Sequence, residues 1–135
     1  MEGETKSIQL PKPIVLNYRT WGTLGQKHVT ALILEKESGE RVEWQIPTSL
    51  NGYKGQKIKI RSKRVEGLEG YIEINDSRKN LDRKAEITAI PKDTKRVLVK
   101  DYMKTSGNVY VNWFEYDIKT GELKPIEIIE EVEVD

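Results

Sequence analysis

Apolar and polar side chains alternate with a period of two along most of this 135-residue chain. That period is typical of β-strands, in which successive side chains point to opposite faces. Val42, Trp44 and Ile46, for example, fall on one face. The segment 28–37 carries apolar residues on both faces, which is typical of a central strand. We expect at most a single helical turn, over residues 78–83, so the sequence predicts an all-β fold.

Turn residues divide this pattern into short strands. Glycine, proline, asparagine or aspartate follows most of the apolar runs, which is where β-strands end. Short strands of this kind suit a small closed barrel better than a flat sheet, because closure removes exposed edges. We expect a flexible N-terminal arm at 1–13, a barrel at 14–91 and a C-terminal β-extension at 92–135. The predicted strands in the region 14–91 lie within residues 14–18, 28–37, 41–46, 57–64, 71–75 and 85–90.

Residues 51–64 carry six positive charges and no acidic residue. From residue 57 the cations alternate with Ile58 and Ile60, so one face of this strand is expected to enter a core. The other face carries cations about 7 Å apart, which is twice the rise per strand residue. Such a row suits a polyanion, because neutralising a phosphate backbone releases counterions. It suits a solvated edge strand equally well, since exposed lysines on an edge prevent strand-to-strand aggregation.

The formal net charge of +1 hides a polarity along the chain. Residues 51–104 contain fifteen Lys or Arg and eight Asp or Glu, whereas residues 105–135 contain two and eight. This asymmetry is typical of a nucleic-acid-binding body with an acidic end. Two mutually attracting parts of one chain would show the same asymmetry.

Residue types that many reactions need are scarce. There is no Cys, which excludes disulfides and thiolate metal sites, and His28 is the single histidine. Glycine-rich phosphate loops, nucleophile elbows and HExxH metal motifs are absent. Carboxylates such as Glu35, Glu66 and Asp76 lie in turns and on exposed strand positions, where solubility explains them. We therefore expect no catalytic activity, no cofactor and no metal.

The sequence also bears on where the protein works. No apolar run approaches the roughly 18 residues of a membrane span, and the first ten residues lack the pattern of a signal peptide. We expect a soluble, cytoplasmic protein, associated with the nucleoid if it binds DNA. Charged residues make up 33% of the chain, a composition that favours a thermophilic source.

Two stretches together resemble a known family. They are TALILEKESGERVEWQIP, from Thr30, and GYKGQKIKIRSKRVEGLEGYIEIND, from Gly52. Their order of strand, acidic-glycine turn, strand, loop and glycine-containing hairpin is similar to archaeal single-stranded-DNA-binding proteins and the OB-folds of replication protein A. The resemblance implies a five-stranded OB-fold barrel that binds single-stranded nucleic acid, DNA rather than RNA, with little sequence preference. The family's stacking aromatic at the end of the third strand aligns with Ile46, and Trp44 lies two residues earlier.

Such a site holds a single strand through cations that follow the backbone and through aromatic rings, each stacked base contributing about 1–3 kcal/mol. Tyr71 falls on the polar face of its strand, and Tyr53 lies in a glycine-flanked loop with little core to enter. Trp44 suits core packing as well as it suits a base. The candidate nucleic-acid-binding residues are Trp21, Trp44, Tyr53, Lys57, Lys59, Arg61, Lys63, Arg64, Tyr71, Arg78 and Lys79.

The last third of the chain is predicted to add strands at 96–103, 108–116 and 124–134, as a β-extension packed on the barrel in preference to a second nucleic-acid surface. Its acidic end is similar in charge to the C-terminal tails with which single-stranded-DNA-binding proteins recruit partners. The alternation of Ile or Val with Glu suits an edge strand equally. The residues expected to contact a replication or repair protein are Glu127, Glu130, Glu131, Glu133 and Asp135.

A second function stays open, in which the OB-fold is a scaffold or accessory subunit. Its basic face would then bind an acidic protein partner in a replication or transcription complex or in a viral assembly. This alternative predicts that Lys59 and Arg61 matter for a protein complex while Tyr53 and Tyr71 do not.

Overall fold

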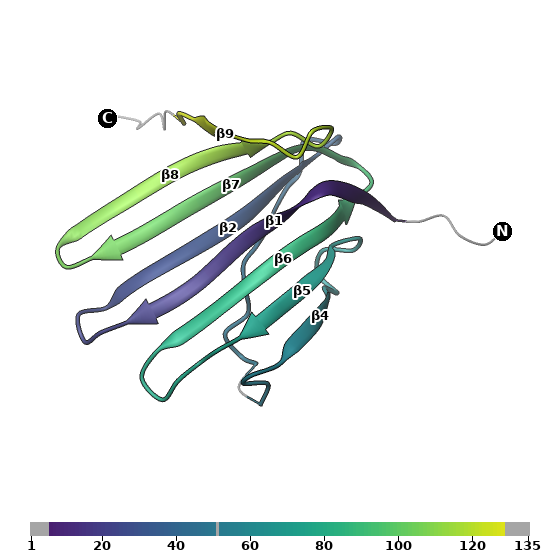
Figure 1. Ribbon diagram of the computed structural model, residues 1–135. Coiled ribbons are helices and arrows are strands. Elements are labelled where there is room, and N and C mark those ends of the chain that lie inside the picture. The colour runs from purple at the N-terminus through teal and green to yellow at the C-terminus, as the bar shows by residue number, and fades with distance from the viewer. Residues whose placement is uncertain (1–5, 51, 129–135) are drawn as a thin grey trace.

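The computed structural model describes residues 6–50 and 52–128, and it is all-β, as the sequence predicts (Figure 1). The strands form one antiparallel nine-stranded sheet in the order β4-β5-β6-β1-β2-β7-β8-β9, with β3 paired to β2. They are β1 (Ser7–Trp21), β2 (Gln26–Lys36), β3 (Arg41–Trp44), β4 (Lys57–Arg61), β5 (Glu69–Ile74), β6 (Leu81–Pro91), β7 (Thr94–Thr105), β8 (Asn108–Tyr116) and β9 (Leu123–Ile126).

β1 is longer than the sequence pattern indicates. It begins at Ser7, so strand structure extends into the segment 1–13 that was expected to be a flexible arm. Its pairing with β6 shifts register over the stretch that contains Pro11 and Pro13. The irregularity accommodates both prolines, because a proline has no amide hydrogen to donate to the ladder.

β2 is the strand at which the sheet branches. One of its edges pairs with β7 from Lys27 to Lys36. The other edge pairs first with β1, at residues 26–29, and then with β3, at residues 32–35. β1 and β2 therefore pair only near the turn that joins them, and further along the chain β3 is the neighbour of β2 on this edge.

The core lies between the β1–β6 part of the sheet and the β2–β3 part. Tyr18 and Val29 are register partners on one face, and Leu16 on β1 has the same parity as Tyr18. Leu32 and Leu34 on β2 have the opposite parity to Val29, yet they share a buried cluster with Leu16. β1 and β6 thus overlie β3. In Figure 1 the segment that follows β2 accordingly runs behind β1 and β6.

The last third of the chain contributes to this same core. Val97 and Val99 of β7 and Tyr116 of β8 belong to the buried cluster. The Tyr116 hydroxyl donates a hydrogen bond to the Lys12 carbonyl at 2.5 Å, which ties β8 to β1. The boundary expected between residues 91 and 92 therefore falls in a turn, with both sides sharing one core.

The sheet is not closed into the five-stranded barrel that the sequence predicted. In the strand order of the described residues, β4 and β9 stand at the two ends, and β3 pairs only with β2. The physical reason is that β3 has only four residues and is soon followed by Pro47, which has no amide hydrogen to donate, so β3 ends before it can form a ladder with β4. β3 and β4 still approach each other through side chains, since Trp44, Leu50 and Ile60 line one cavity of about 240 Å³.

A buried ion pair holds the connection from β5 to β6. The segment 78–83, where at most a helical turn was expected, forms this turn and the start of β6. The fully buried Arg83 donates to Oδ2 of Asp76 from Nε (3.0 Å) and Nη2 (2.5 Å), and from Nη1 to the Pro47 carbonyl (2.5 Å). Burial alone raises the pKa of Asp76, but hydrogen bonds from Arg83 and the Asp82 amide outweigh it, so this pKa lies below its ordinary value.

Two glycines allow the β4–β5 hairpin to pack closely against β1 and β6. Gly67 has a φ of +96°, and a Cβ at this position would collide with the Lys6 carbonyl. A Cβ at Gly70 would collide with the Glu86 carbonyl of β6. The glycines of the hairpin thus mark close backbone approach, which only a residue without a side chain permits.

Candidate nucleic-acid interface

β4 presents its cations on one side and its isoleucines on the other, which confirms the alternation read from the sequence. Lys57, Lys59 and Arg61 are exposed. Ile60 is 5% exposed and lies in the core, and Ile58 packs against that core. Because β4 is the last strand at its end of the sheet, its outer edge pairs with no strand among the described residues. The three cations therefore stand on an open edge.

β5 places an exposed tyrosine beside these cations. Tyr71 is the register partner of Lys59, and its exposed fraction is 42%. The Lys57 ammonium lies 5.2 Å from the centroid of the Tyr71 ring, which is a cation–π contact. We call the surface formed by Lys57, Lys59, Arg61 and Tyr71 the β4 face. A base stacked on the ring would have cations for its phosphates close by.

Acidic residues lie on the same side of the sheet. The register partners are Lys57 with Glu73, Arg61 with Glu69, and Tyr71 with Glu86. All seven ion pairs found in the described part of the chain nevertheless use other basic residues. The cations of the β4 face are therefore available to an external anion.

The loop after β4 continues the row of cations. Lys63 and Arg64 are both exposed. The loop is anchored, because Val65 and Leu68 are each 2% exposed and the Val65 amide donates to the Ser62 hydroxyl at 3.0 Å. The two cations are consequently held near the end of β4.

Two further cations lie beyond the opposite end of the β4 face. Arg78 and Lys79 are exposed in the turn between β5 and β6. Hydrogen bonds close this turn, from the Ser77 amide to the Asn80 carbonyl (2.9 Å) and from the Asn80 amide to the Ser77 hydroxyl (3.2 Å). Since β4 and β5 are antiparallel, the turn follows the end of β5 that pairs with the start of β4.

The remaining aromatic candidates lie in different settings. Trp44 is 8% exposed and packs in the core opposite Leu32, so of its two expected roles the structure realises core packing. Ile46, which aligns with the family's stacking position, is 3% exposed. Trp21 is half-buried at the end of β1. Tyr53 is 45% exposed in the loop before β4, which leaves it available for stacking.

The acidic end of the chain is described only in part. β9 pairs with β8 as the last strand of the sheet, and Glu127 is exposed just after it. The other four residues expected to contact a partner lie outside the described residues: Glu130, Glu131, Glu133 and Asp135.

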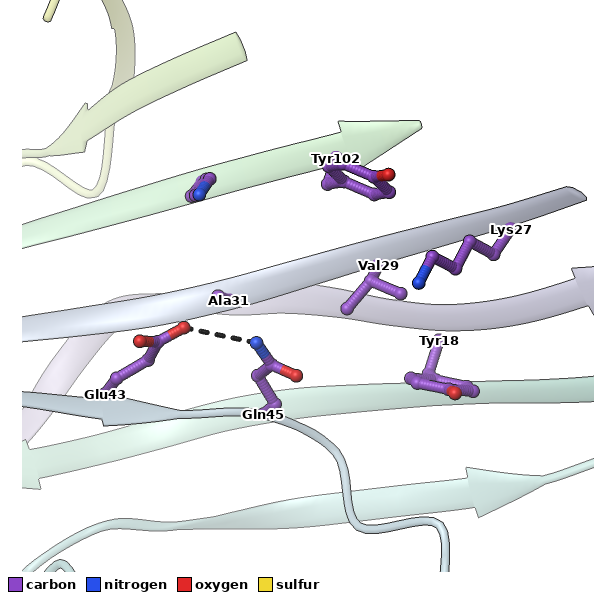
Figure 2. Close-up of a pocket in the computed structure, with 8 residues that line it drawn as sticks. Tyr18, Lys27, Val29, Ala31, Glu43, Gln45 and Tyr102 are labelled. Atoms are coloured by element: carbon purple, nitrogen blue, oxygen red, sulfur yellow. Dashed lines mark hydrogen bonds between the residues drawn. The ribbon is translucent and has the colours of Figure 1, made fainter. Parts of the chain in front are cut away.

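A second aromatic and basic surface consists of residues that the sequence analysis did not name as candidates. The Lys27 ammonium lies 5.4 Å from the Tyr102 ring centroid, and the Lys100 ammonium lies 5.4 Å from that of Trp113. The alternation of Lys100, Tyr102 and Lys104 carried a signal, but the sequence analysis gave this segment only as a strand of the C-terminal β-extension. Beside Tyr102 is a cleft of about 300 Å³ (Figure 2), lined by Tyr18, Lys27, Val29, Ala31, Glu43, Gln45, Lys100 and Tyr102.

Residues 6–50 and 52–128 also bear on metal sites and on membrane-spanning helices. These residues contain no group of three or more His, Cys, Asp or Glu side chains that could hold a metal ion. They include no helix long and apolar enough to cross a membrane. Nε2 of His28 forms a hydrogen bond with Oδ1 of Asp101 on β7, at 2.5 Å.

Comparison of the chain with protein-family models, curated proteins and solved structures found no match. The resemblance to OB-fold proteins that bind single-stranded DNA therefore stays a prediction from sequence motifs. Any function assigned to the chain has to follow from its own surface.

Proposed function

We propose that this protein binds single-stranded nucleic acid, DNA in preference to RNA, through the β4 face and the cations at its two ends. The observation that carries the proposal is a row of three cations on an open strand edge, none of them in an ion pair among the described residues. Exposed Tyr71 lies beside this row. Cations on alternate strand residues are about 7 Å apart, a pitch comparable to that of an extended phosphate backbone.

The proposed binding is non-catalytic and has little sequence preference. Cations contact phosphates, which are the same at every position, and an aromatic ring stacks on any base. Tyr71 and Tyr53 are the stacking residues, with Trp21 as a further candidate. Lys57, which now lies over the Tyr71 ring, would turn to a phosphate when a base occupies the ring.

An OB-fold for residues 14–91 enters this proposal only as an analogy. β1 to β6 supply the strands of that region. β3 and β4, which would have to meet for closure, share a side-chain-lined cavity, and no ladder between them is found in the described residues. The binding proposal rests on the surface of β4 and β5 and is independent of closure.

The test is a fluorescence anisotropy titration with oligo-dT, oligo-U and duplex DNA at two salt concentrations. Single-strand affinity should fall with salt, with a logarithmic slope of about 0.7 per neutralised phosphate. The double variant Lys59→Ala/Arg61→Ala should weaken binding and reduce this slope by up to about 1.4. The matched control is Lys92→Ala/Lys95→Ala, which removes two exposed cations near the β6–β7 turn. A flat salt response, or equal effects of the two double variants, would refute the proposal.

A protein partner is the second candidate, and the interleaved carboxylates Glu69, Glu73 and Glu86 favour it. A face of mixed charge on an open strand edge suits another protein, which can match both signs and add a strand. The protein would then act as an accessory subunit of a larger complex, with the acidic end near Glu127 as another contact. In that case Tyr71→Ala and Lys59→Ala would leave nucleic-acid affinity unchanged, and the same titration would detect this.

A further inference from the structure

The cleft beside Tyr102 opens on the side of the sheet opposite the β4 face. Tyr71, Glu86 and Val15 are register partners in one row and share the side of the β4 face. Tyr18 is three residues beyond Val15 on β1, so its side chain points to the other side, where it lines the cleft. A single strand lying across β4 and β5 would therefore leave this cleft empty.

The walls of the cleft are two tyrosines at the same level of the sheet. Tyr18 pairs with Val29, and Val29 pairs with Tyr102, so the three form a row across β1, β2 and β7. Neighbouring strands are about 4.8 Å apart, which puts the two tyrosine backbones about 10 Å from each other. Figure 2 shows the two rings on either side of Val29. The small side chains of Val29 and Ala31 form a floor on which a flat ring can lie between the tyrosines.

The branch in the sheet supplies the polar end of the cleft. Further along β2, at residues 32–35, its neighbour is β3 in place of β1. This places Glu43 of β3, and Gln45 just after it, in the wall of the cleft. Gln45 Nε2 donates to Oε1 of Glu43 at 3.1 Å (Figure 2). The second carboxylate oxygen of Glu43 and the Gln45 carbonyl remain as acceptors, so this end favours a ligand that carries N–H donors.

Two lysines supply positive charge to the cleft. Lys27 and Lys100 both line it, and neither takes part in the ion pairs found in the described chain. The Lys27 ammonium lies over Tyr102, and its side chain extends toward Val29 in Figure 2. An anionic group attached to a ring stacked on Tyr102 would therefore find an ammonium within a short side-chain movement.

We infer that this cleft binds a nucleotide whose base carries an exocyclic amino group. The base lies between Tyr18 and Tyr102, its amino group donates to Glu43, and its phosphate contacts Lys27 and Lys100. The volume of about 300 Å³ is at the lower end for small-molecule sites and suits one nucleotide. Cytosine, adenine and guanine have the required donor, whereas uracil and thymine present a carbonyl there. This inference goes beyond the single-strand binding proposed above and does not rest on it.

The nucleotide has two sources with the same chemistry, a free mononucleotide or one base of a strand. An adjoining cleft shares Tyr18, Glu43 and Gln45 with the first and extends to Arg64. Phosphates on either side of a bound base would therefore have a further cation along this path. The experiment has to distinguish the two sources.

Calorimetric titration of the full chain with CMP and UMP tests the inference, because these ligands differ only at C4 and N3 of the base, where cytosine has an amino group and an acceptor nitrogen and uracil has a carbonyl and an N–H. CMP should bind at least about 10-fold more tightly, the effect of one hydrogen bond to a charged acceptor. Tyr102→Ala should weaken CMP binding by about 5- to 150-fold, the loss of one stacked base. Glu43→Gln should abolish the preference for CMP, and Lys27→Ala should weaken both ligands. Tyr110→Ala, which removes an exposed tyrosine from the side of β8 that faces away from the cleft, is the matched control and should change neither.

The same variants are titrated with oligo-dC and oligo-dT to identify the source. If CMP binds and Tyr102→Ala weakens its binding, the site is supported and its ligand is a free nucleotide. If oligo-dC binds and CMP does not, and if Tyr102→Ala and Glu43→Gln both weaken this binding, the site is supported and its ligand is one base of a strand. Equal competition by inorganic phosphate, or indifference of both ligands to all three variants, overturns it. Glu43 is exposed, so Glu43→Gln keeps the test decisive if Tyr102→Ala unfolds. Lys59→Ala/Arg61→Ala reports separately on the β4 face.

Discussion

Asp76→Asn is expected to destabilise the fold strongly, because it removes the charged partner of a fully buried cation. The Arg83 side chain is 0% exposed and that of Asp76 is 14% exposed. Nε and Nη2 of Arg83 both donate to this carboxylate. Breaking a buried ion pair by removing one partner costs about 3–5 kcal/mol, since the remaining charge has no compensation. For a 135-residue domain this corresponds to a fall in Tm of roughly 10–18 °C.

The effect of this substitution should depend on pH in a defined direction. The pKa of Asp76 is lowered in the folded protein relative to its ordinary value of 3.8. The ion pair therefore contributes its full stability above pH 3.8, and this is lost as pH falls through the lower folded value. The difference in unfolding free energy between the two proteins should be constant near neutrality and shrink below about pH 4.

Urea denaturation followed by circular dichroism at pH 7 and pH 3 measures both effects. The matched control is Asp93→Asn, since Asp93 lies 3.9 Å from Lys36 and its side chain is 56% exposed. An exposed pair of this kind contributes about 1 kcal/mol or less. The explanation fails if Asp76→Asn costs no more than Asp93→Asn, or if its cost is larger at pH 3 than at pH 7.

Three further substitutions test separate parts of the structure. Tyr71→Ala should weaken single-strand binding by about 5- to 150-fold while Tyr71→Trp retains it, because the aromatic face stacks the base; equal affinities in anisotropy titrations would exclude stacking at this position. Tyr116→Phe should lower the unfolding free energy by about 0.5–1.5 kcal/mol through loss of the bond to the Lys12 carbonyl, and no change in urea denaturation would contradict that bond. Gly70→Ala should cost about 1–3 kcal/mol or more, because its Cβ would collide with the Glu86 carbonyl; an unchanged Tm would show that β5 and β6 are not so close.

The alternation of apolar and polar residues correctly predicted where most strands lie and which of their faces are buried. The alternation of Ile58 and Ile60 with cations placed β4 correctly, because side-chain parity in a strand is set by neighbouring residues. The shared parity of Trp44 with Val42 indicated one face, and in the structure Trp44 is buried on that face while Val42 is partly buried against the core. The exposure predicted for Tyr71 from its position opposite Ile72 is confirmed.

Features that depend on distant pairing were not predictable from such patterns. The pairing of β2 with β7 joins Ala31 to Lys100, and nothing local to either residue specifies the other. The first part of β1 was not predicted as a strand because it contains Pro11 and Pro13. A register shift in the pairing of β1 with β6 accommodates both prolines. Tyr18 and Tyr102 could be recognised as candidate binding residues only from the strand register, which places them in one row. The nucleic-acid affinity of the β4 face stays a prediction.

The position of β2 has a consequence for how the protein folds. Its hydrogen-bonded partners run from Tyr18 on β1 to Lys104 on β7, so the strand is completed only when segments far apart in the chain have met. Chains dominated by such non-local pairs fold slowly, in milliseconds to seconds. Until β7 has paired, one edge of β2 has no partner, and an unpaired strand edge is prone to aggregation. Once β7 docks, the amides of β2 are flanked on both sides and should be among the last to exchange with deuterium.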